Sequence, residues 1–280
     1  MTAPHAAAPG HLRVTTFNVL HDGVRSRLPA WPQRRPLVAG LIRSLAPDLA
    51  GLQEVSPRQL VDLEHDLPEY TVLSGEPSGA TRLPSWISAL AAPALWWLGD
   101  FFSEGERCPI LIRDGAMTLE TGSWHLRHSP TPHVVPWARV EVRRRRYTIY
   151  NTHLGSWAAC ATAAALAAWL DDAWRGEPQI LMGDFNARPG TAFWRELARR
   201  TRPELPGFLD AWAVAERRDG SGATFHWGKG WPGPRLDFIV FRPGPAPAVA
   251  ATASGRAGRA FPSDHRALTV DFDPDPGTAV

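Results

Sequence analysis

Strand-like segments that follow one another directly are the feature that most constrains the fold of this chain. Residues 134–142 and 146–154 are rich in β-branched and aromatic residues, and only the arginine run 143–146 joins them. This pattern predicts a β-hairpin rather than two strands separated by a helix. Similar runs predict further strands at residues 12–20, 49–55, 70–73, 109–113, 116–124, 178–185, 235–242 and 265–272.

Helical patterns are fewer than strand patterns. Apolar residues recur at helical spacing over 34–48, and alanine-rich residues 158–174 and residues 190–200 also favour helices. Ser56, Pro57 and Gln59 form a helix start with a cap, a first-turn proline and a capping-box partner. With several strands joined by hairpins, we expect an α/β sandwich rather than a purely parallel, doubly wound sheet.

The chain has 280 residues and no Pro/Gly/Ser-rich linker, so we expect a single domain over 11–273 after a disordered lead at 1–10. A formal net charge of +2 is not typical of a strong nucleic-acid binder. Two cysteines without metal-ligand spacing favour a reducing compartment, and we expect a cytoplasmic protein. The most apolar stretch, 86–102, is too short and broken to span a bilayer, so no transmembrane segment is expected.

Polar side chains stand where several of the predicted strands begin or end. These residues are Asn18, Glu54, Asn151, His153, Asp184, Asn186, Asp237, Asp264 and His265. Each alone has an ordinary structural explanation, such as a turn, a bulge or a satisfied core group. Their repetition points to a site, because an unpaired carboxylate in an apolar run is costly. Acidic oxygens suit a hard cation, and histidines can move protons.

The segments "FNV", "LQE", "NTHL", "GDFN", "RLDFI" and "SDH" run in this order from residue 17 to residue 265. Each motif is short, but the ordered set resembles the endonuclease/exonuclease/phosphatase superfamily of metal-dependent phosphoesterases. The resemblance implies a four-layer α/β/β/α sandwich, in which two mixed β-sheets pack face to face and the site lies at one edge of the sheets.

The resemblance also implies a metal site. Glu54 is expected to be the main Mg²⁺ ligand, with Mn²⁺ able to substitute. Asn18 and Asp264 are expected to hold or orient the metal, directly or through water. One or two acidic ligands suffice for Mg²⁺, which keeps several of its waters.

The remaining residues receive catalytic roles from the same resemblance. Asp184 is expected to orient the attacking water or take its proton, and Asn186 to hydrogen-bond that water or a phosphate oxygen. His153 is expected to donate to the phosphoryl oxygen. Asp237 is expected to orient His265, which also faces the phosphate; Asn151 is left as a residue that shapes the strand end.

Substrate choice stays open between a nucleic acid and a small or lipid phosphoester, and nothing in the sequence sets the oligomeric state. A Trp-rich insertion at about 76–107 carries Trp86, Trp96, Trp97, Phe101 and Phe102. These residues either stack on a base, contact a lipid or bind a partner, or they pack as a small helical core. The arginine run 143–146 is interpreted as a solvated turn, and His226 as a possible substrate contact. The alternative function is a non-catalytic binding module that retains the fold.

Overall fold

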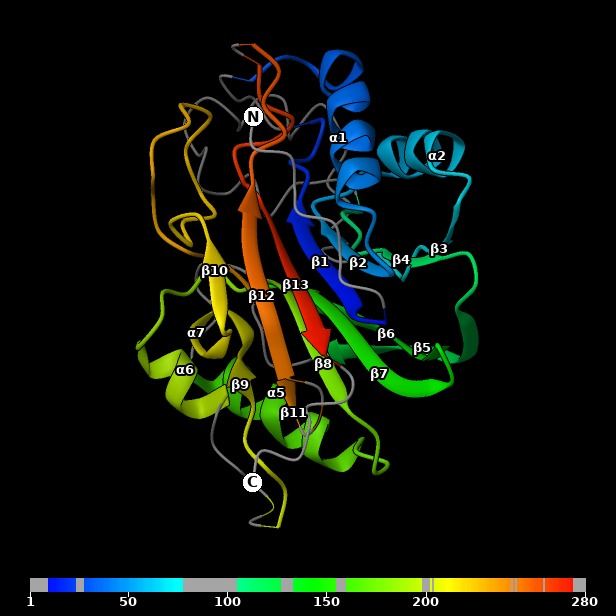
Figure 1. Ribbon diagram of the computed structural model, residues 1–280, viewed down its shortest axis with the longest axis vertical. Helices are drawn as coiled ribbons and strands as arrows, with labels where there is room; N and C mark the ends of the chain where they lie inside the picture. The colour runs from blue at the N-terminus through cyan, green and yellow to red at the C-terminus, as the bar shows by residue number, and fades with distance from the viewer. Residues whose placement is uncertain are drawn as a thin grey trace.

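The computed structural model describes residues 10–23, 28–77, 105–126, 133–154, 160–197, 202, 204–242, 244, 246–258 and 260–273. Two mixed β-sheets pack face to face, and helices lie on their outer sides (Figure 1). This arrangement confirms the predicted four-layer α/β/β/α sandwich. Residues 1–9 of the predicted lead, and residues 78–104 with the aromatic residues of the insertion, lie outside the described residues.

The first sheet has seven strands, with parallel and antiparallel neighbours. Their order is β10 (Arg217–Asp219), β12 (Ala246–Ala253), β13 (Ala267–Asp273), β1 (Leu12–Asn18), β2 (Leu49–Gln53), β4 (Ile110–Arg113) and β3 (Tyr70–Leu73). Strands β1 and β2 are parallel, so their carboxyl ends reach the same edge of the sheet.

The second sheet has six strands. Their order is β5 (Met117–Leu126), β6 (His133–Val142), β7 (Arg145–His153), β8 (Gln179–Asp184), β11 (Asp237–Arg242) and β9 (Leu209–Asp210). Strands β7 and β8 are parallel, whereas β11 runs antiparallel to β8 and therefore begins where β8 ends.

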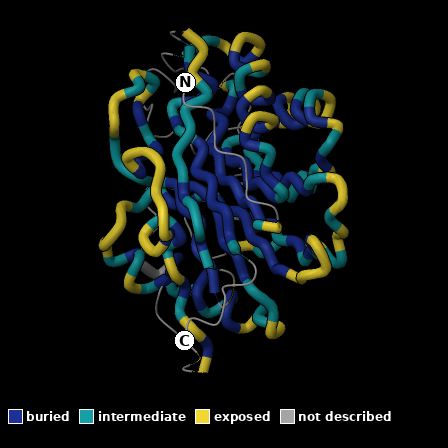
Figure 2. The backbone as a smooth tube through the Cα atoms, viewed as in Figure 1, coloured by how far each residue is buried: buried dark blue, intermediate teal, exposed yellow. Residues whose placement is uncertain are grey.

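The core between the two sheets is mainly apolar and closed to solvent. Val14 and Leu49 of the first sheet belong to one cluster with Ile149, Ile180 and Ile239 of the second. All five are fully buried, and Figure 2 shows the central strands as buried along their length. Burying such side chains contributes about 1.5–3 kcal/mol each, so the layers fix the strand ends firmly relative to one another.

Helices cover both outer faces. Helices α1 (Trp31–Leu45) and α2 (Pro57–Asp66) pack on the first sheet around a second cluster, which includes Ile42 and Leu63. Helices α5 (Cys160–Asp172) and α6 (Ala192–Leu197) pack on the second sheet around Phe185 and Phe238. No helix among the described residues is both long and apolar enough to cross a membrane.

Local sequence explains most element boundaries. The side chain of Ser56 accepts from the backbone of Gln59, whose own side chain accepts from the backbone of Ser56, which confirms the predicted capping box of α2. Helix α1 stops at Leu45, earlier than the predicted residue 48, because Pro47 disfavours a helical residue before it. Ala46 instead adopts a left-handed conformation with φ 48°.

The predicted hairpin is confirmed, with its turn at Arg143 and Arg144. Both residues have positive φ, 50° and 66°, as the tight turn between β6 and β7 requires. The guanidinium of Arg143 donates two hydrogen bonds to the carboxylate of Asp48. Arg146 pairs with Glu141 on the neighbouring strand. These contacts agree with the interpretation of the arginine run as a solvated turn.

Several elements were not predicted. Strand β12 consists mostly of alanine and lacks the β-branched alternation of the other strands. It forms because it pairs with β13 from Ala246 to Ala253. The short elements β9, α7 (Ala211–Val214) and β10 also escaped prediction. Their stability comes from the sheets they join rather than from local pattern.

Candidate active site

Three predicted site residues meet on adjacent strands of the second sheet. His153 is the last residue of β7 and Asp184 the last of β8, and the two are paired across the parallel strands. Asp237 is the first residue of β11 and is paired with Asp184 from the other side. The register therefore places an imidazole and two carboxylates in a row at one edge of the sheet.

The first sheet brings its own polar groups to the same edge. Asn18 ends β1 and is paired with Gln53, which ends β2. Glu54 follows at once and adopts a left-handed conformation with φ 57°. A non-glycine residue in this region carries a cost of about 1–3 kcal/mol. The amide of Asn18 donates to Glu54 Oε1 at 2.8 Å and to Asp184 Oδ2 at 3.0 Å, so it links the two sheets' carboxylates.

Asp184 lies at the centre of the cluster. Its side chain is 2% exposed, and its Oδ2 is 3.7 Å from Nε2 of His153 and 3.7 Å from Nε2 of His265. Its Oδ1 accepts from the backbone of Asn186 at 2.9 Å. Burial and the charge of Asp237 raise the pKa of Asp184, against the lowering effect of the two histidines. One carboxylate oxygen thus faces two imidazoles.

In each of these two histidines the other ring nitrogen, Nδ1, lies within hydrogen-bond distance of a carboxylate. His265 Nδ1 is 2.8 Å from Asp237 Oδ2, as predicted for this pair. Burial alone would lower the pKa of His265, but the charges of Asp237 and Asp184 outweigh burial and raise it to about 10. Asp264 and His265 lie just before β13 rather than inside it, because that strand begins at Ala267.

His153 is held in the same way by Glu106, a residue that the sequence interpretation missed. His153 Nδ1 hydrogen-bonds to Glu106 Oε1. Burial lowers the pKa of His153, but Glu106 and then Asp184 and Glu54 raise it well above its ordinary value. Glu106 lies near the end of the insertion at about 76–107 and lacks a strand-end motif, so only the fold reveals it. The site therefore contains two carboxylate–imidazole pairs that flank Asp184.

Asn186 and Asn151 have different positions. The amide of Asn186 lies 3.1 Å from His153 Nε2 and donates to the carbonyl of Leu154 at 2.8 Å, so Asn186 belongs to the cluster. Asn151 is fully buried between the sheets, where it donates to the carbonyls of Leu52 and Pro109 and accepts from Gln53. Asn151 therefore fixes the strand ends.

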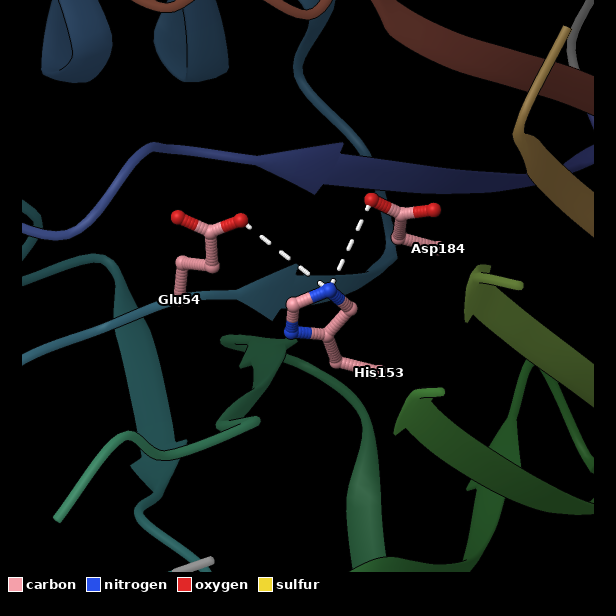
Figure 3. A group of neighbouring side chains, drawn as sticks. All are labelled: Glu54, His153 and Asp184. Atoms are coloured by element: carbon pink, nitrogen blue, oxygen red, sulfur yellow. Dashed lines mark ion pairs between the residues drawn. The ribbon is translucent and has the colours of Figure 1, made fainter. Parts of the chain in front are cut away.

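The glutamate, the histidine and the central aspartate converge in Figure 3, where Nε2 of His153 lies between the carboxylates of Glu54 and Asp184. Glu54 Oε1 is 3.9 Å from that nitrogen. Burial raises the pKa of Glu54 to about 7; His153 opposes this shift, and the charges of Glu106 and Asp264 add to it. A carboxylate in such surroundings is stabilised when a cation binds beside it.

Candidate ligand atoms form two groups in the described part of the chain. Glu54, His153 and Asp184 form one group, and Asp184, Asp237 and His265 form the other; within each, the ligand atoms lie within 4.8 Å of one another. Asp237 Oδ1 is buried and finds no hydrogen-bond partner among the described residues. The Glu54 side chain is 17% exposed, which leaves room for water around a bound ion. Oxygen ligands and nearby water fit a hard divalent cation.

Asn18 and Asp264 were predicted to assist the metal. The Asn18 amide contacts Glu54 and Asp184 of the first group, whereas Asp264 belongs to neither group. Asn18 Oδ1 accepts from the backbone of Leu20 at 3.0 Å, so both ends of its amide are engaged by protein. The charge of Asp264 contributes to the raised pKa of Glu54.

A buried arginine supports the edge that carries Glu54 and was not singled out from the sequence. Arg34 of α1 is 2% exposed and donates to the carbonyls of Val19, Leu20 and Pro262. Burial lowers the pKa of Arg34, and the charges of Asp264 and Glu54 oppose this shift. Its guanidinium ties the end of β1 to the loop that carries Asp264.

Comparisons with known proteins agree with this geometry. The model of the Endonuclease/Exonuclease/phosphatase family matches residues 15–265, a range that contains every residue of the cluster. A search of curated proteins found no match.

Solved structures share the fold at low sequence identity. An endonuclease/exonuclease/phosphatase from Bacteroides vulgatus has 22% identity and a TM-score of 0.76, over 94% of this chain and 99% of its own. A mannosyl-6-phosphatase from Bacteroides thetaiotaomicron has 18% identity and a TM-score of 0.69, over 93% and 99%. TDP2 from D. rerio, complexed with a single-strand DNA product, has 17% identity and a TM-score of 0.70, over 94% and 99%.

Proposed function

Because the chain belongs to the endonuclease/exonuclease/phosphatase family of phosphoesterases, we propose that it hydrolyses a phosphoester by direct attack of water, with Mg²⁺ bound at Glu54. The observation that carries this proposal is the central Asp184 oxygen with an imidazole nitrogen 3.7 Å away on each side. Such a cluster can accept a proton from water and stabilise negative charge on a phosphoryl group.

The proposed reaction forms one bond to phosphorus and breaks another. Asp184 orients the attacking water and takes its proton, while the water oxygen bonds to phosphorus. The ester bond to the leaving oxygen then breaks, and that oxygen leaves with the bonding electrons. His153 and His265 donate hydrogen bonds to the phosphoryl group as charge grows, and Asn186 orients the water or a phosphate oxygen. No covalent enzyme intermediate is required.

The two carboxylate–imidazole pairs fit this task. A carboxylate on Nδ1 fixes the ring orientation and favours the protonated imidazole, so Nε2 can act as a donor. In this reaction Glu106 positions His153 and Asp237 positions His265. Glu54 would hold the metal ion, with Asp264 and Asn18 acting on it directly or through water. Mg²⁺ would neutralise charge on the phosphate when bound.

The substrate class is tested by a panel of phosphomonoesters and phosphodiesters, including DNA, RNA, phospholipids and phosphosugars, each assayed with Mg²⁺ and with Mn²⁺. We expect hydrolysis of at least one phosphoester, and none in the presence of a chelator. The structural neighbours include proteins named for a phosphosugar and crystallised with single-strand DNA, so both belong in the panel. Binding of a phosphoester without turnover under any of these conditions would favour a non-catalytic module instead.

Replacing Glu106 with Gln should lower turnover by about tenfold to a hundredfold, because His153 loses the carboxylate that orients it. The pH profile should also change. The raised pKa of His153 keeps the ring protonated, and activity is lost as the pH rises through that pKa. A neutral amide at position 106 lowers the pKa, so the alkaline loss of activity should move to lower pH.

A matched control exists on the surface. Glu76 also pairs with an imidazole, that of His125 at 3.0 Å, but both side chains are exposed. Glu76→Gln should leave turnover and its pH profile unchanged. An unaltered alkaline limb in Glu106→Gln would show that Glu106 does not position a catalytic imidazole.

A further inference from the structure

The loop of residues 224–234 presents two exposed tryptophans beside the candidate site. Trp227 is 52% exposed and Trp231 is 68% exposed, and no other described tryptophan is classed as exposed. Lys229, the single lysine of the sequence, stands between them and places its Nζ 5.5 Å from the ring centroid of Trp231. Tryptophan is highly buried on average, so two exposed indoles in one loop make this loop a candidate contact surface.

A row of aromatic rings connects this surface to the site. The ring of Phe225 lies 4.9 Å from the ring of His265 and 5.0 Å from the ring of Trp227, measured between centroids. Phe225 and His265 also form an isolated β-bridge. Trp227 is therefore only one ring removed from the imidazole that faces Asp184.

The backbone of the loop is fixed by its neighbours. His226 is fully buried; its backbone donates to the carbonyl of Asp264 at 2.8 Å and its Nδ1 accepts from Gly230 at 3.1 Å. Burial lowers the pKa of His226 to about 4, which keeps Nδ1 available as an acceptor at neutral pH. Arg266 donates to the carbonyl of Gly230 at 2.8 Å. His226 thus anchors the loop, which differs from the predicted direct substrate contact.

The exposed indole of Trp227 is held in an unusual conformation. Its φ is 52°, in the left-handed region that few bulky residues adopt. A Cβ at Gly233 would come within 2.8 Å of the Trp227 ring and 2.2 Å of the Phe225 carbonyl oxygen, so only glycine allows this packing. Strain of this kind persists where the surrounding structure enforces it and is concentrated at functional sites.

We propose that Trp227, Lys229 and Trp231 bind an unpaired nucleic-acid strand next to the scissile phosphate, with bases stacked on the indoles and a backbone phosphate near the lysine. The lysine ammonium lies 5.5 Å from the Trp231 ring, so a base stacked on that indole would bring its backbone phosphate close to a positive charge. Stacking on aromatic side chains needs little sequence preference and only modest net charge, in agreement with the net charge of +2. This inference rests on the proposed phosphoesterase function.

The test measures binding separately from cleavage. Fluorescence anisotropy of a labelled oligothymidylate, in chelator, gives the Kd for the wild-type protein and for Trp227→Ala, Trp231→Ala and Lys229→Gln. A strand of the same length without bases is the matched ligand. The wild type should bind the thymidylate more tightly, and each Trp variant should raise its Kd about tenfold while binding to the abasic strand stays the same.

Lys229→Gln should instead weaken the binding of both strands. The slope of the logarithm of the binding constant against the logarithm of the salt concentration should become shallower by about one unit. Val61→Ala, at a residue that is 65% exposed on α2, is the control and should change nothing. Because Trp231 is the more exposed indole, Trp231→Ala should keep the wild-type melting temperature. Trp227→Ala also loses the ring contact with Phe225, so Trp227→Phe, which keeps a ring, is measured beside it and should retain part of the thymidylate binding.

Equal Kd values for the two strands, or unchanged binding in both Trp variants, would overturn the proposal. The Trp variants are also tested for binding to vesicles of anionic phospholipid. If they lose vesicle binding that the wild type shows, while their thymidylate binding stays intact, the indoles contact a membrane surface and the proposal is overturned. Failure of the phosphoesterase proposal is distinguishable, because the wild type would then bind strands but hydrolyse no phosphoester.

Discussion

Replacing Asp184 with Asn should lower kcat at least about a hundredfold, the scale expected when an acid–base group is lost. Asp184 is the only residue of the described cluster that faces both imidazole nitrogens and the amide of Asn18. An Asn side chain cannot take a proton from water. It would also turn an NH₂ group toward either the Asn18 amide or the Asn186 backbone N–H, since Asp184 accepts from both.

The same substitution has a separate effect on stability. Two hydrogen-bond donors that face each other in a buried site cost about 1–3 kcal/mol of stability. The substitution also removes the repulsion between the buried carboxylates of residues 184 and 237, which is seen in the pKa of Asp184 that the charge of Asp237 raises. We therefore expect the variant to fold. Thermal melts check this point, and Asp48→Asn is the control, since Asp48 pairs with Arg143 at the hairpin turn. A kcat within about fivefold of wild type would remove Asp184 from the proton-transfer role.

Replacing Glu54 with Gln should abolish most of the stabilisation that Mg²⁺ gives to the fold. Burial raises the pKa of Glu54 from its ordinary value of 4.5 to about 7. A carboxyl with a raised folded pKa favours folding in its protonated form, so the metal-free protein should lose stability as the pH rises from about 4.5 through 7. The loss from this group reaches up to about 3 kcal/mol.

A bound cation reverses this penalty, because it favours the ionised carboxylate. Adding Mg²⁺ at pH 8 should therefore raise the melting temperature of the wild type and leave that of Glu54→Gln almost unchanged. In chelator, the variant should also show a smaller fall in melting temperature between pH 5 and pH 8. Equal Mg²⁺-induced shifts in the two proteins would place the metal elsewhere.

The strand ends were predictable because their chemistry is local in sequence. Asp184, Asn186 and His153 each follow an apolar run, and a strand end is visible as the point where such a run stops. The pairing of Asp237 with His265 was also expected, as an implication of the family resemblance. The sheet register then brings these residues together, and the fold confirms that they share one edge.

Other parts of the site depend on contacts that no local pattern encodes. Glu106 reaches His153 from a segment 47 residues earlier in the chain, and Arg34 reaches Pro262 across 228 residues. Neither residue stands at the end of an apolar run. The same reason explains why β12 was missed, since its alanines become a strand only through pairing with β13. The exposure of Trp227 and Trp231 to solvent could not be predicted either, because it depends on how the loop of residues 224–234 packs against the rest of the fold.

The most direct test of the central claim is a Mg²⁺ titration of phosphodiester hydrolysis by chelator-treated protein, run on the wild type and on Glu54→Gln. We predict no hydrolysis without metal, full recovery in the wild type as Mg²⁺ is added, and a requirement for at least about tenfold more Mg²⁺ in the variant. Full activity of the metal-stripped wild type, or identical titration curves for the two proteins, would contradict a metal-dependent phosphoesterase site at Glu54.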